Sequence, residues 1–212
     1  MVKADAGGLK AKFDHILSRE RALAETVARA LKTPRPLSVW EVLLPIFFIF
    51  NYARARAGRD LLIRNYLFTK ELALEAALDL AREEISRAEA LAPAEERTRE
   101  LLAAVRDGIY SEEIRQKQLE EVNLLVDHYR LLLEAAGPDF ESLVREAYGR
   151  LEKYNGFLDR LRAVENEVSR AALGTLGQRG DPGFAARLGE VTDQVRRRWA
   201  RRIFGAAPEG DA

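Results

Sequence analysis

The sequence of 212 residues contains no cysteine, one methionine and only two histidines. The absence of cysteine excludes disulfides, thiolate zinc sites, iron–sulfur clusters and cysteine nucleophiles, and it suits a reducing compartment. A di-iron carboxylate site needs an E-x-x-H motif on each of two helices. Lys12 and Leu125 stand where His15 and His128 would need that glutamate. We therefore expect partly exposed, hydrogen-bonded histidines and no cofactor.

Motifs of the common enzyme classes are also missing. The sequence has no G-x-x-x-x-G-K-[ST] loop, no G-x-G-x-x-G after a strand and no G-x-S-x-G elbow. Glu20 and Glu165 interrupt apolar heptad positions, where a polar residue more often fixes the register of packed helices than takes part in catalysis. The sequence therefore gives no support to an enzyme.

No hydrophobic run is long enough to cross a membrane as a helix, which requires about 20 apolar residues. The densest run, residues 39–52, has fourteen positions and contains Glu41 and Pro45. The first apolar-rich segment is amphipathic and lacks the pattern of a secretory signal. We expect a cytoplasmic protein, with contact at the inner face of the membrane as an alternative.

The formal net charge is zero, but the charge is spread unevenly along the chain. Residues 1–70 carry 13 basic and 6 acidic side chains (+7), residues 71–170 carry 14 and 23 (−9), and residues 171–212 carry 7 and 5 (+2). The basic first third could face an anionic surface, or it could pair with the acidic middle inside the fold; we favour pairing. An isoelectric point of about 6.8 argues against a nucleic-acid partner.

Good helix formers dominate the composition, and alternating strand patterns are not evident. The sequence predicts an all-α fold, an antiparallel bundle of six or seven helices with coiled-coil-like heptad spacing. We expect one domain over residues 1–204, in which residues 174–183 form a linker before a last basic helix. Residues 205–212 are expected to be a disordered tail.

The bundle should be organised around a central helix at about residues 60–91. Its polar residues fall on one narrow stripe, and the rest of its surface is apolar. The stripe consists of Arg64, Glu71, Glu75, Asp79, Arg82 and Ser86. A helix that is apolar over so much of its circumference needs neighbours on several sides.

Cap and turn residues predict the other helices. The first covers about residues 9–32, the second starts at Ser38, and a short one runs from Pro93 to Gly108. Ser111 caps the next, whose core positions are Val122, Leu125, Tyr129 and Leu132. An unbroken heptad register through Gly149 and Gly156 predicts one long helix at about residues 140–173. A last helix follows at about residues 184–204.

Several short segments together resemble a family of all-α bacterial proteins that has no assigned activity. They are the segments at residues 36–40, 65–70, 114–118, 127–129 and 167–172. The resemblance would cover most of the chain. It implies a bacterial source and a helical scaffold, and it supplies no activity and no site residues.

Two regions are candidate contact surfaces for a partner or a membrane. They contain Trp40, Phe47, Phe48, Phe50, Arg54, Arg56 and Arg59 in the first region, and Arg196, Arg197 and Arg201 in the second. The aromatic run has three possible environments: it could be buried against the central helix, dock a protein or lie on a bilayer. We favour burial. The second cluster also fits a helix C-terminus, where the helix dipole favours cations.

Glu71, Glu75 and Asp79 follow i, i+4 spacing, so their carboxylates line up and are candidates for holding a metal cation. The alternative, which we favour, is a polar stripe paired with arginines of the first helix or of a loop.

These observations favour a non-enzymatic interaction or scaffold protein with a protein partner. One alternative is a membrane-peripheral subunit that binds anionic lipid or a membrane complex. A second alternative is a helical bundle that binds a metal or another ligand.

Overall fold

A computed structural model describes residues 6–31, 58–82, 85–104 and 110–206. Over these ranges the chain is helical without strands, which confirms the predicted all-α bundle. The helices are α1 (Ala6–Ala30), α2 (Gly58–Ala81), α3 (Arg87–Ala104), α4 (Glu112–Glu134), α5 (Phe140–Tyr148), α6 (Leu151–Leu176) and α7 (Pro182–Ile203), with a short 3-10 turn, η2 (Gly177–Arg179), before α7. None of the helices in the described ranges is long and apolar enough to span a membrane.

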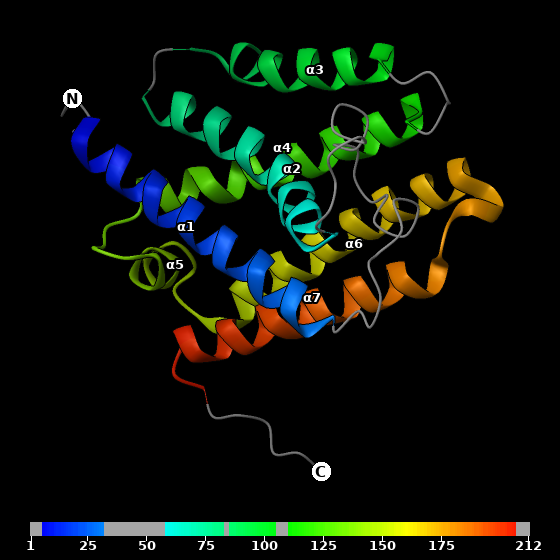
Figure 1. The fold of residues 1–212 in the computed structure, drawn as a ribbon. Coiled ribbons are helices and arrows are strands. Elements are labelled where there is room, and N and C mark those ends of the chain that lie inside the picture. The colour runs from blue at the N-terminus through cyan, green and yellow to red at the C-terminus, as the bar shows by residue number, and fades with distance from the viewer. Residues whose placement is uncertain (1–5, 32–57, 83–84, 105–109, 207–212) are drawn as a thin grey trace.

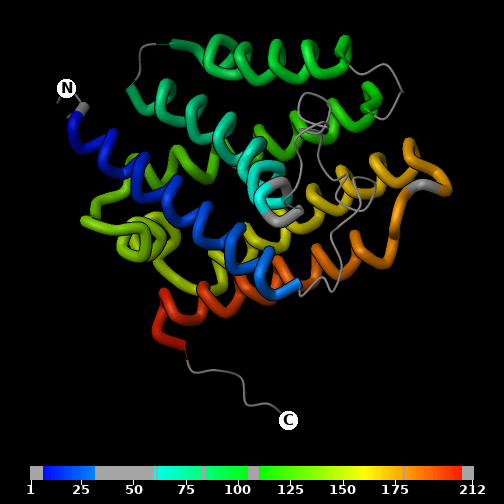
Figure 2. The backbone as a smooth tube through the Cα atoms, viewed as in Figure 1, coloured from blue at the N-terminus to red at the C-terminus, as the bar shows by residue number. Residues whose placement is uncertain are grey.

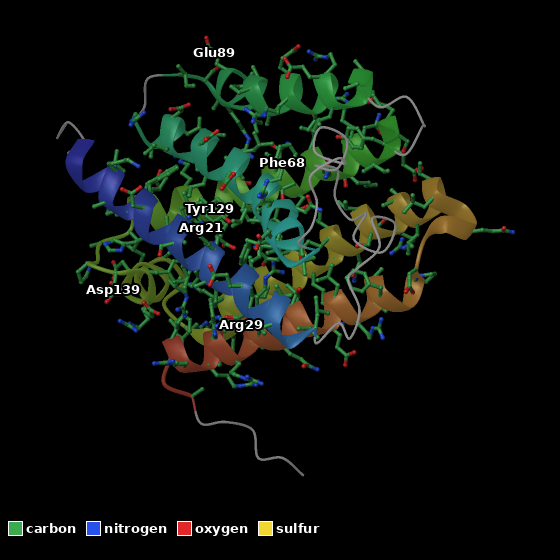
Figure 3. The ribbon with its side chains drawn as sticks, viewed as in Figure 1. Arg21, Arg29, Phe68, Glu89, Tyr129 and Asp139 are labelled. Carbon is green, nitrogen blue, oxygen red and sulfur yellow. The ribbon has the colours of Figure 1, made fainter. Side chains whose placement is uncertain are left out.

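Helix α2 is enclosed on nearly every side, as its apolar surface predicts. It packs most extensively on α4 and also contacts α1 and α3. Helix α4 shares the centre of the bundle, because it packs against α1, α2, α3, α5 and α6. In Figure 1, α3 lies along one edge of the molecule and α7 along the opposite edge. The predicted core positions Val122, Leu125, Tyr129 and Leu132 are all buried, and Figure 3 shows Tyr129 in the interior.

The end of α2 differs from the prediction. The helix ends at Ala81, not near residue 91, and α3 starts at Arg87 and continues through Pro93. Ser86 and Glu89 form a reciprocal pair at this start: the Ser86 backbone and hydroxyl donate to the Glu89 carboxylate, and the Glu89 backbone donates to the Ser86 hydroxyl. This capping box starts a new helix at Arg87. The apolar pattern continues across the break because α3 also packs on α2 and α4.

The predicted long helix at residues 140–173 is two helices. Gly149 ends α5 with a φ of 71°, a left-handed conformation that residues other than glycine rarely adopt, and α6 begins at Leu151. The turn is visible between α5 and α6 in Figure 2. Gly156 lies inside α6 without a break, as predicted. The heptad register crosses Gly149 because both helices bury their apolar faces in the same core.

The predicted linker is shorter than expected. Helix α6 continues through Gly174 to Leu176, and Gly177 then opens the 3-10 turn with a φ of 54°. Asp181 caps α7 by accepting a hydrogen bond from the backbone of Phe184, and Pro182 occupies the first turn. The short connection places α6 and α7 side by side, which forms one wall of the site described next.

Candidate functional site

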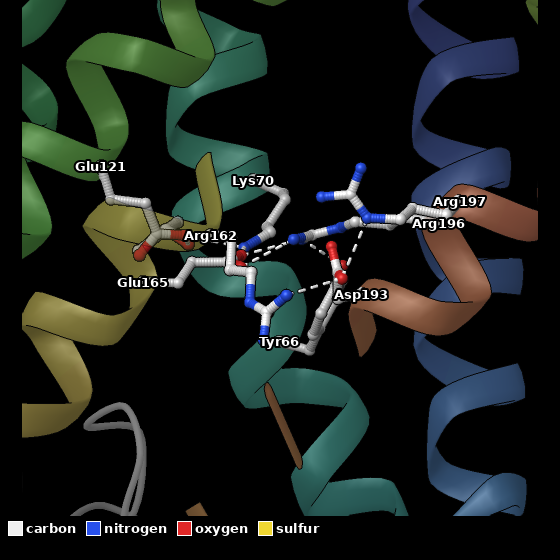
Figure 4. Close-up of polar contacts among 9 residues, drawn as sticks. Tyr66, Lys70, Glu121, Arg162, Glu165, Asp193, Arg196 and Arg197 are labelled. Atoms are coloured by element: carbon white, nitrogen blue, oxygen red, sulfur yellow. Dashed lines mark hydrogen bonds and ion pairs between the residues drawn. The ribbon is translucent and has the colours of Figure 1, made fainter. Parts of the chain in front are cut away.

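Four charged side chains from four helices meet inside the bundle (Figure 4). Lys70 of α2 binds Glu121 of α4 at 2.7 Å and Glu165 of α6 at 3.0 Å. The guanidinium of Arg196 of α7 donates to both oxygens of Glu165, at 2.6 and 2.8 Å. We call these four residues, with Tyr66 and Thr69, the central ion-pair network. It ties α2, α4, α6 and α7 together through alternating charges.

Helical spacing on α2 brings Tyr66 and Thr69, the two uncharged members of the network, next to the ion pairs. Tyr66 and Lys70 are one turn apart, so their side chains lie on the same face. The Tyr66 hydroxyl accepts a hydrogen bond from Arg196 at 2.7 Å, and the Thr69 hydroxyl donates to Glu121 at 2.8 Å. Every charged member of the network is therefore paired, as burial requires.

The neighbours of these groups keep them ionised. Burial alone would raise the pKa of Glu165, but the positive charges of Arg196 and Lys70 outweigh it and lower that pKa to about 2. Burial would lower the pKa of Lys70, and the carboxylates of Glu121 and Glu165 raise it above its usual range instead. Neither group exchanges a proton near neutral pH, so the network provides fixed charges and not acid–base catalysts.

A cavity of about 80 Å³ lies beside the network. We call it the α2–α7 cavity. Its walls include the apolar side chains Leu62, Val168, Ala185 and Leu188, the polar side chains Asn65, Ser169 and Thr192, and the charged side chains Lys70, Arg162, Arg196, Glu121, Glu165 and Asp193. One water molecule needs roughly 10–15 Å³ of such space, so the cavity has room for several waters or one small molecule.

Ion pairs between α6 and α7 border the cavity. Arg162 donates to Asp193 at 2.8 Å, and Arg197 donates to the same carboxylate at 3.0 Å and to Asp159 at 2.6 Å. Three cations and three carboxylates line the cavity, and each of these groups has a partner of opposite charge. The lining is therefore neutral as a whole.

Three buried polar side chains of the lining have unused hydrogen-bonding capacity. Asn65 is 0% exposed, and neither its amide nitrogen nor its amide oxygen has a partner. Glu121 uses Oε1 for both Thr69 and Lys70, so that Oε2 accepts no hydrogen bond from the described residues. The hydroxyl of Thr192, which is 5% exposed, is likewise unpartnered among them. Buried polar groups are nearly always hydrogen-bonded, so the fully buried Asn65 amide marks a place where a partner is missing, and Glu121 Oε2 and the Thr192 hydroxyl are further free groups in the same lining.

The first group of candidate contact residues lies outside the part of the chain that the structure describes. It consists of Trp40, Phe47, Phe48, Phe50, Arg54 and Arg56, together with the side chain of Arg59. Arg196 is buried within the central ion-pair network, and Arg197 is paired with two aspartates. Arg201 lies half-buried on α7. The described part of the basic cluster therefore contributes largely to packing between α6 and α7.

Glu71 and Glu75 of α2 line a second hollow, of about 560 Å³, whose lining carries both positive and negative side chains. Glu71 lies near Arg21 of α1 and Arg97 of α3; burial raises its pKa, and these arginines oppose that effect. Asp79 pairs with Arg82 at 3.5 Å on the same helix. Within the described residues, no three histidines or carboxylates come close enough together to hold a metal ion.

His128 differs from its prediction, because it is buried rather than partly exposed. Its Nδ1 shares a hydrogen bond of 2.7 Å with the Tyr148 hydroxyl, and its ring stacks on Phe157 with centroids 4.0 Å apart. Burial, with a smaller contribution from Arg196, lowers the pKa of His128 to about 3. His15 is exposed on α1. The two histidines therefore lie in different environments, one buried and one exposed.

The two predicted register residues both turn inward. Glu165 is a member of the network, and Glu20 approaches the buried Tyr129 hydroxyl, where burial raises the pKa of the Glu20 carboxyl. Sequence reasoning missed Asn65, Lys70 and Glu121. The sequence did contain a signal for Asn65 and Lys70. Together with Thr69, they are polar residues on the otherwise apolar part of α2, away from the predicted polar stripe.

Comparison of the chain with models of protein families, with curated proteins and with solved structures finds no match.

Proposed function

We propose that this protein binds a small molecule in the α2–α7 cavity and does not convert it. One observation carries the proposal: the fully buried amide of Asn65 on α2, which has no hydrogen-bond partner, lines a cavity together with Glu121 of α4 and Thr192 of α7, and the charged groups of that cavity already neutralise each other. Ligand sites in helical bundles commonly combine apolar walls with a few polar groups of this kind. This favours the ligand-binding alternative over a metal-binding one.

The electrostatics of the cavity support binding over catalysis. A general acid or base works best with a pKa near the ambient pH. The pKa of Glu165 lies near 2, and that of Lys70 lies above its usual range, so neither group fits this role. Their paired charges hold α2, α6 and α7 in place around the cavity, which keeps the polar groups of the site fixed.

Filling the cavity tests the proposal. Gly189 lines the cavity on α7, and a side chain added there meets the Asn166 side chain at an ordinary contact distance of 3.7 Å. Gly189→Leu should therefore fold and occupy the space. Gly156→Leu is the matched control, because Gly156 lies inside α6 with nothing within 4 Å of an added Cβ. The full chain and both variants would be screened by ligand-observed NMR against one library of small neutral and charged fragments.

The proposal requires a set of fragments that bind the unmodified protein and the Gly156→Leu variant but not Gly189→Leu. Fragments that bind all three proteins equally would place binding elsewhere. No bound fragment at all would contradict the proposal, since a formed cavity with free polar groups should accept at least weak ligands.

A protein-interaction or scaffold role in the cytoplasm remains a second proposal. The observation that favours it is a sequence feature, the apolar run at residues 39–52 between α1 and α2. Such a run is typical of a buried or docking segment. Co-purification of the tagged full chain from its native host is the test, and recovery of the protein alone under gentle conditions would count against this role.

A further inference from the structure

We infer that the ligand of the α2–α7 cavity is a small uncharged molecule that carries a primary carboxamide on a short apolar body. This inference rests on the proposed function. It adds the chemical class of the ligand, which follows from the charges, the free hydrogen-bonding atoms and the apolar walls of the site.

The charges of the lining select a neutral ligand. Lys70 and Arg196 are committed to the carboxylates of Glu121 and Glu165, and Arg162 is committed to Asp193. A ligand with a net charge would enter a partly desolvated site in which every opposite charge is already paired. Burial of an unpaired charge is costly, so a neutral molecule is favoured over its anionic or cationic analogue.

The free polar atoms match the edge of a carboxamide. The Asn65 side chain offers an N–H donor and a carbonyl acceptor side by side, and both are unused. A second amide is complementary to this pair, because it offers one acceptor and one donor in the same spacing. A primary amide has a further N–H, and Glu121 Oε2 is a free acceptor in the lining. The Thr192 hydroxyl can donate to the second lone pair of the ligand carbonyl.

The remaining wall explains the apolar body. Leu62 of α2, Val168 of α6 and Leu188 of α7 line the same cavity. Contact with these side chains is favourable for methyl and methylene groups and unfavourable for further polar groups. A polyol would leave hydroxyls without partners against this wall, whereas a short branched aliphatic amide would not.

Four probes that share one branched four-carbon skeleton and differ in their polar group test the chemical class: isobutyramide, isobutyrate, isobutylamine and isobutanol. Each would be titrated into the full-length protein at neutral pH while chemical shifts of the protein are followed by NMR. The inference requires isobutyramide to bind about tenfold or more tightly than each of the other three. Equal or tighter binding of the acid, the amine or the alcohol would overturn the carboxamide class and leave the proposed binding function intact. If no probe binds, and none of the wider fragment library does, both proposals fail.

Asn65→Leu keeps the size of the side chain and removes both amide atoms, so isobutyramide affinity should fall about tenfold while isobutanol affinity is retained. Asn155→Leu is the matched control: Asn155 also has an unpartnered buried oxygen, but it lies on α6 outside the cavity lining. Equal effects of the two substitutions would contradict the inference. A crystal structure of the protein soaked in isobutyramide that shows only water at Asn65 would contradict it as well.

Discussion

Arg196 on α7 and Glu165 on α6 form a bidentate ion pair, in which Nη1 of the arginine donates to Oε2 of the glutamate at 2.6 Å and Nη2 donates to Oε1 at 2.8 Å. Lys70 of α2 approaches the same carboxylate at 3.0 Å. One glutamate side chain therefore joins three helices. Removing one partner of a buried pair leaves the other charge desolvated without compensation, which costs far more than the loss of a surface pair.

Glu165→Gln should destabilise the fold by about 3 kcal/mol, because the charge of Arg196 would remain buried with only the Tyr66 hydroxyl and a neutral amide as partners. Equilibrium unfolding in urea measures this change. Glu167→Gln on the same helix is the control, since it breaks the exposed pair with Arg170 and should cost less than about 1 kcal/mol. Similar losses for the two variants would mean that the network contributes no more than a surface ion pair.

A double substitution separates the cost of an unpaired charge from the net contribution of the pair. Glu165→Leu with Arg196→Met removes both charges, and Lys70 keeps its partner Glu121 at 2.7 Å. Apolar replacement of a whole buried pair is often neutral or stabilising. The double variant should therefore be more stable than Glu165→Gln in the same urea experiment, and a double variant that is less stable would contradict this view.

The sequence was sufficient for the helical class, the N-cap at Ser111 and the four core positions of α4, because these depend on local periodicity and capping. It was not sufficient for the breaks near Ala81 and Gly149. At both places the apolar pattern continues because the next helix packs into the same core, so periodicity alone gives one helix where there are two. The S-x-x-E pattern at Ser86 and Glu89 was a usable signal for the first break.

The candidate site was less predictable than the fold. Lys70, Glu121, Glu165 and Arg196 stand far apart in the sequence, and only the packing of α2, α4, α6 and α7 brings them together. Pairing between the basic first third and the acidic middle of the chain was expected, and the two ion pairs of Lys70 are examples of it. The partners themselves depend on helix rotation and register, which sequence spacing within a single helix does not determine.

The buried His128 should make the fold sensitive to mild acid. Its pKa is lowered from 6.5 to about 3 by burial, so the folded state prefers the neutral ring. The fold keeps its full stability above pH 6.5, where the ring is neutral in both the folded and the unfolded state. Below pH 6.5 the unfolded state takes up a proton more readily, so the free energy of unfolding falls by up to about 1.4 kcal/mol per pH unit. Urea unfolding at a series of pH values between 6.5 and 4.5 measures the slope.

Variants isolate the contribution of His128 from that of the carboxylates. The low pKa of Glu165 adds a loss of stability only as the pH falls below 4.5, and the raised pKa of Glu20 acts in the opposite direction. His128→Phe can keep the stacking on Phe157 and should lower stability at neutral pH while flattening the slope between pH 6.5 and 4.5. The exposed His15→Gln is the control and should keep the slope. An unchanged slope in His128→Phe would assign the acid sensitivity to other groups.

Asn65→Leu should leave stability unchanged or raise it by up to about 1 kcal/mol. The substitution removes two buried polar atoms that have no partner, and an apolar side chain of similar size suits their surroundings. Asn123→Leu is the contrast, since Asn123 donates to the Leu119 carbonyl at 3.0 Å and accepts from Arg87 at 3.2 Å. That variant should lose about 1 kcal/mol. A large loss in Asn65→Leu, measured by urea unfolding without added ligand, would show that the amide is satisfied in solution.

Gly149→Ala and Gly156→Ala should change stability in opposite directions. Gly149 has a φ of 71° at the end of α5, and an added Cβ meets nothing within 4 Å, so the cost is conformational and amounts to about 1 kcal/mol. Gly156 lies in the interior of α6 with the same open space, so alanine there should stabilise by up to about 1 kcal/mol through its higher helix propensity. Thermal unfolding of the two variants side by side measures the difference. Stabilisation by both substitutions would mean that α5 and α6 form one continuous helix in solution, because alanine at residue 149 is favourable only in a right-handed helical conformation.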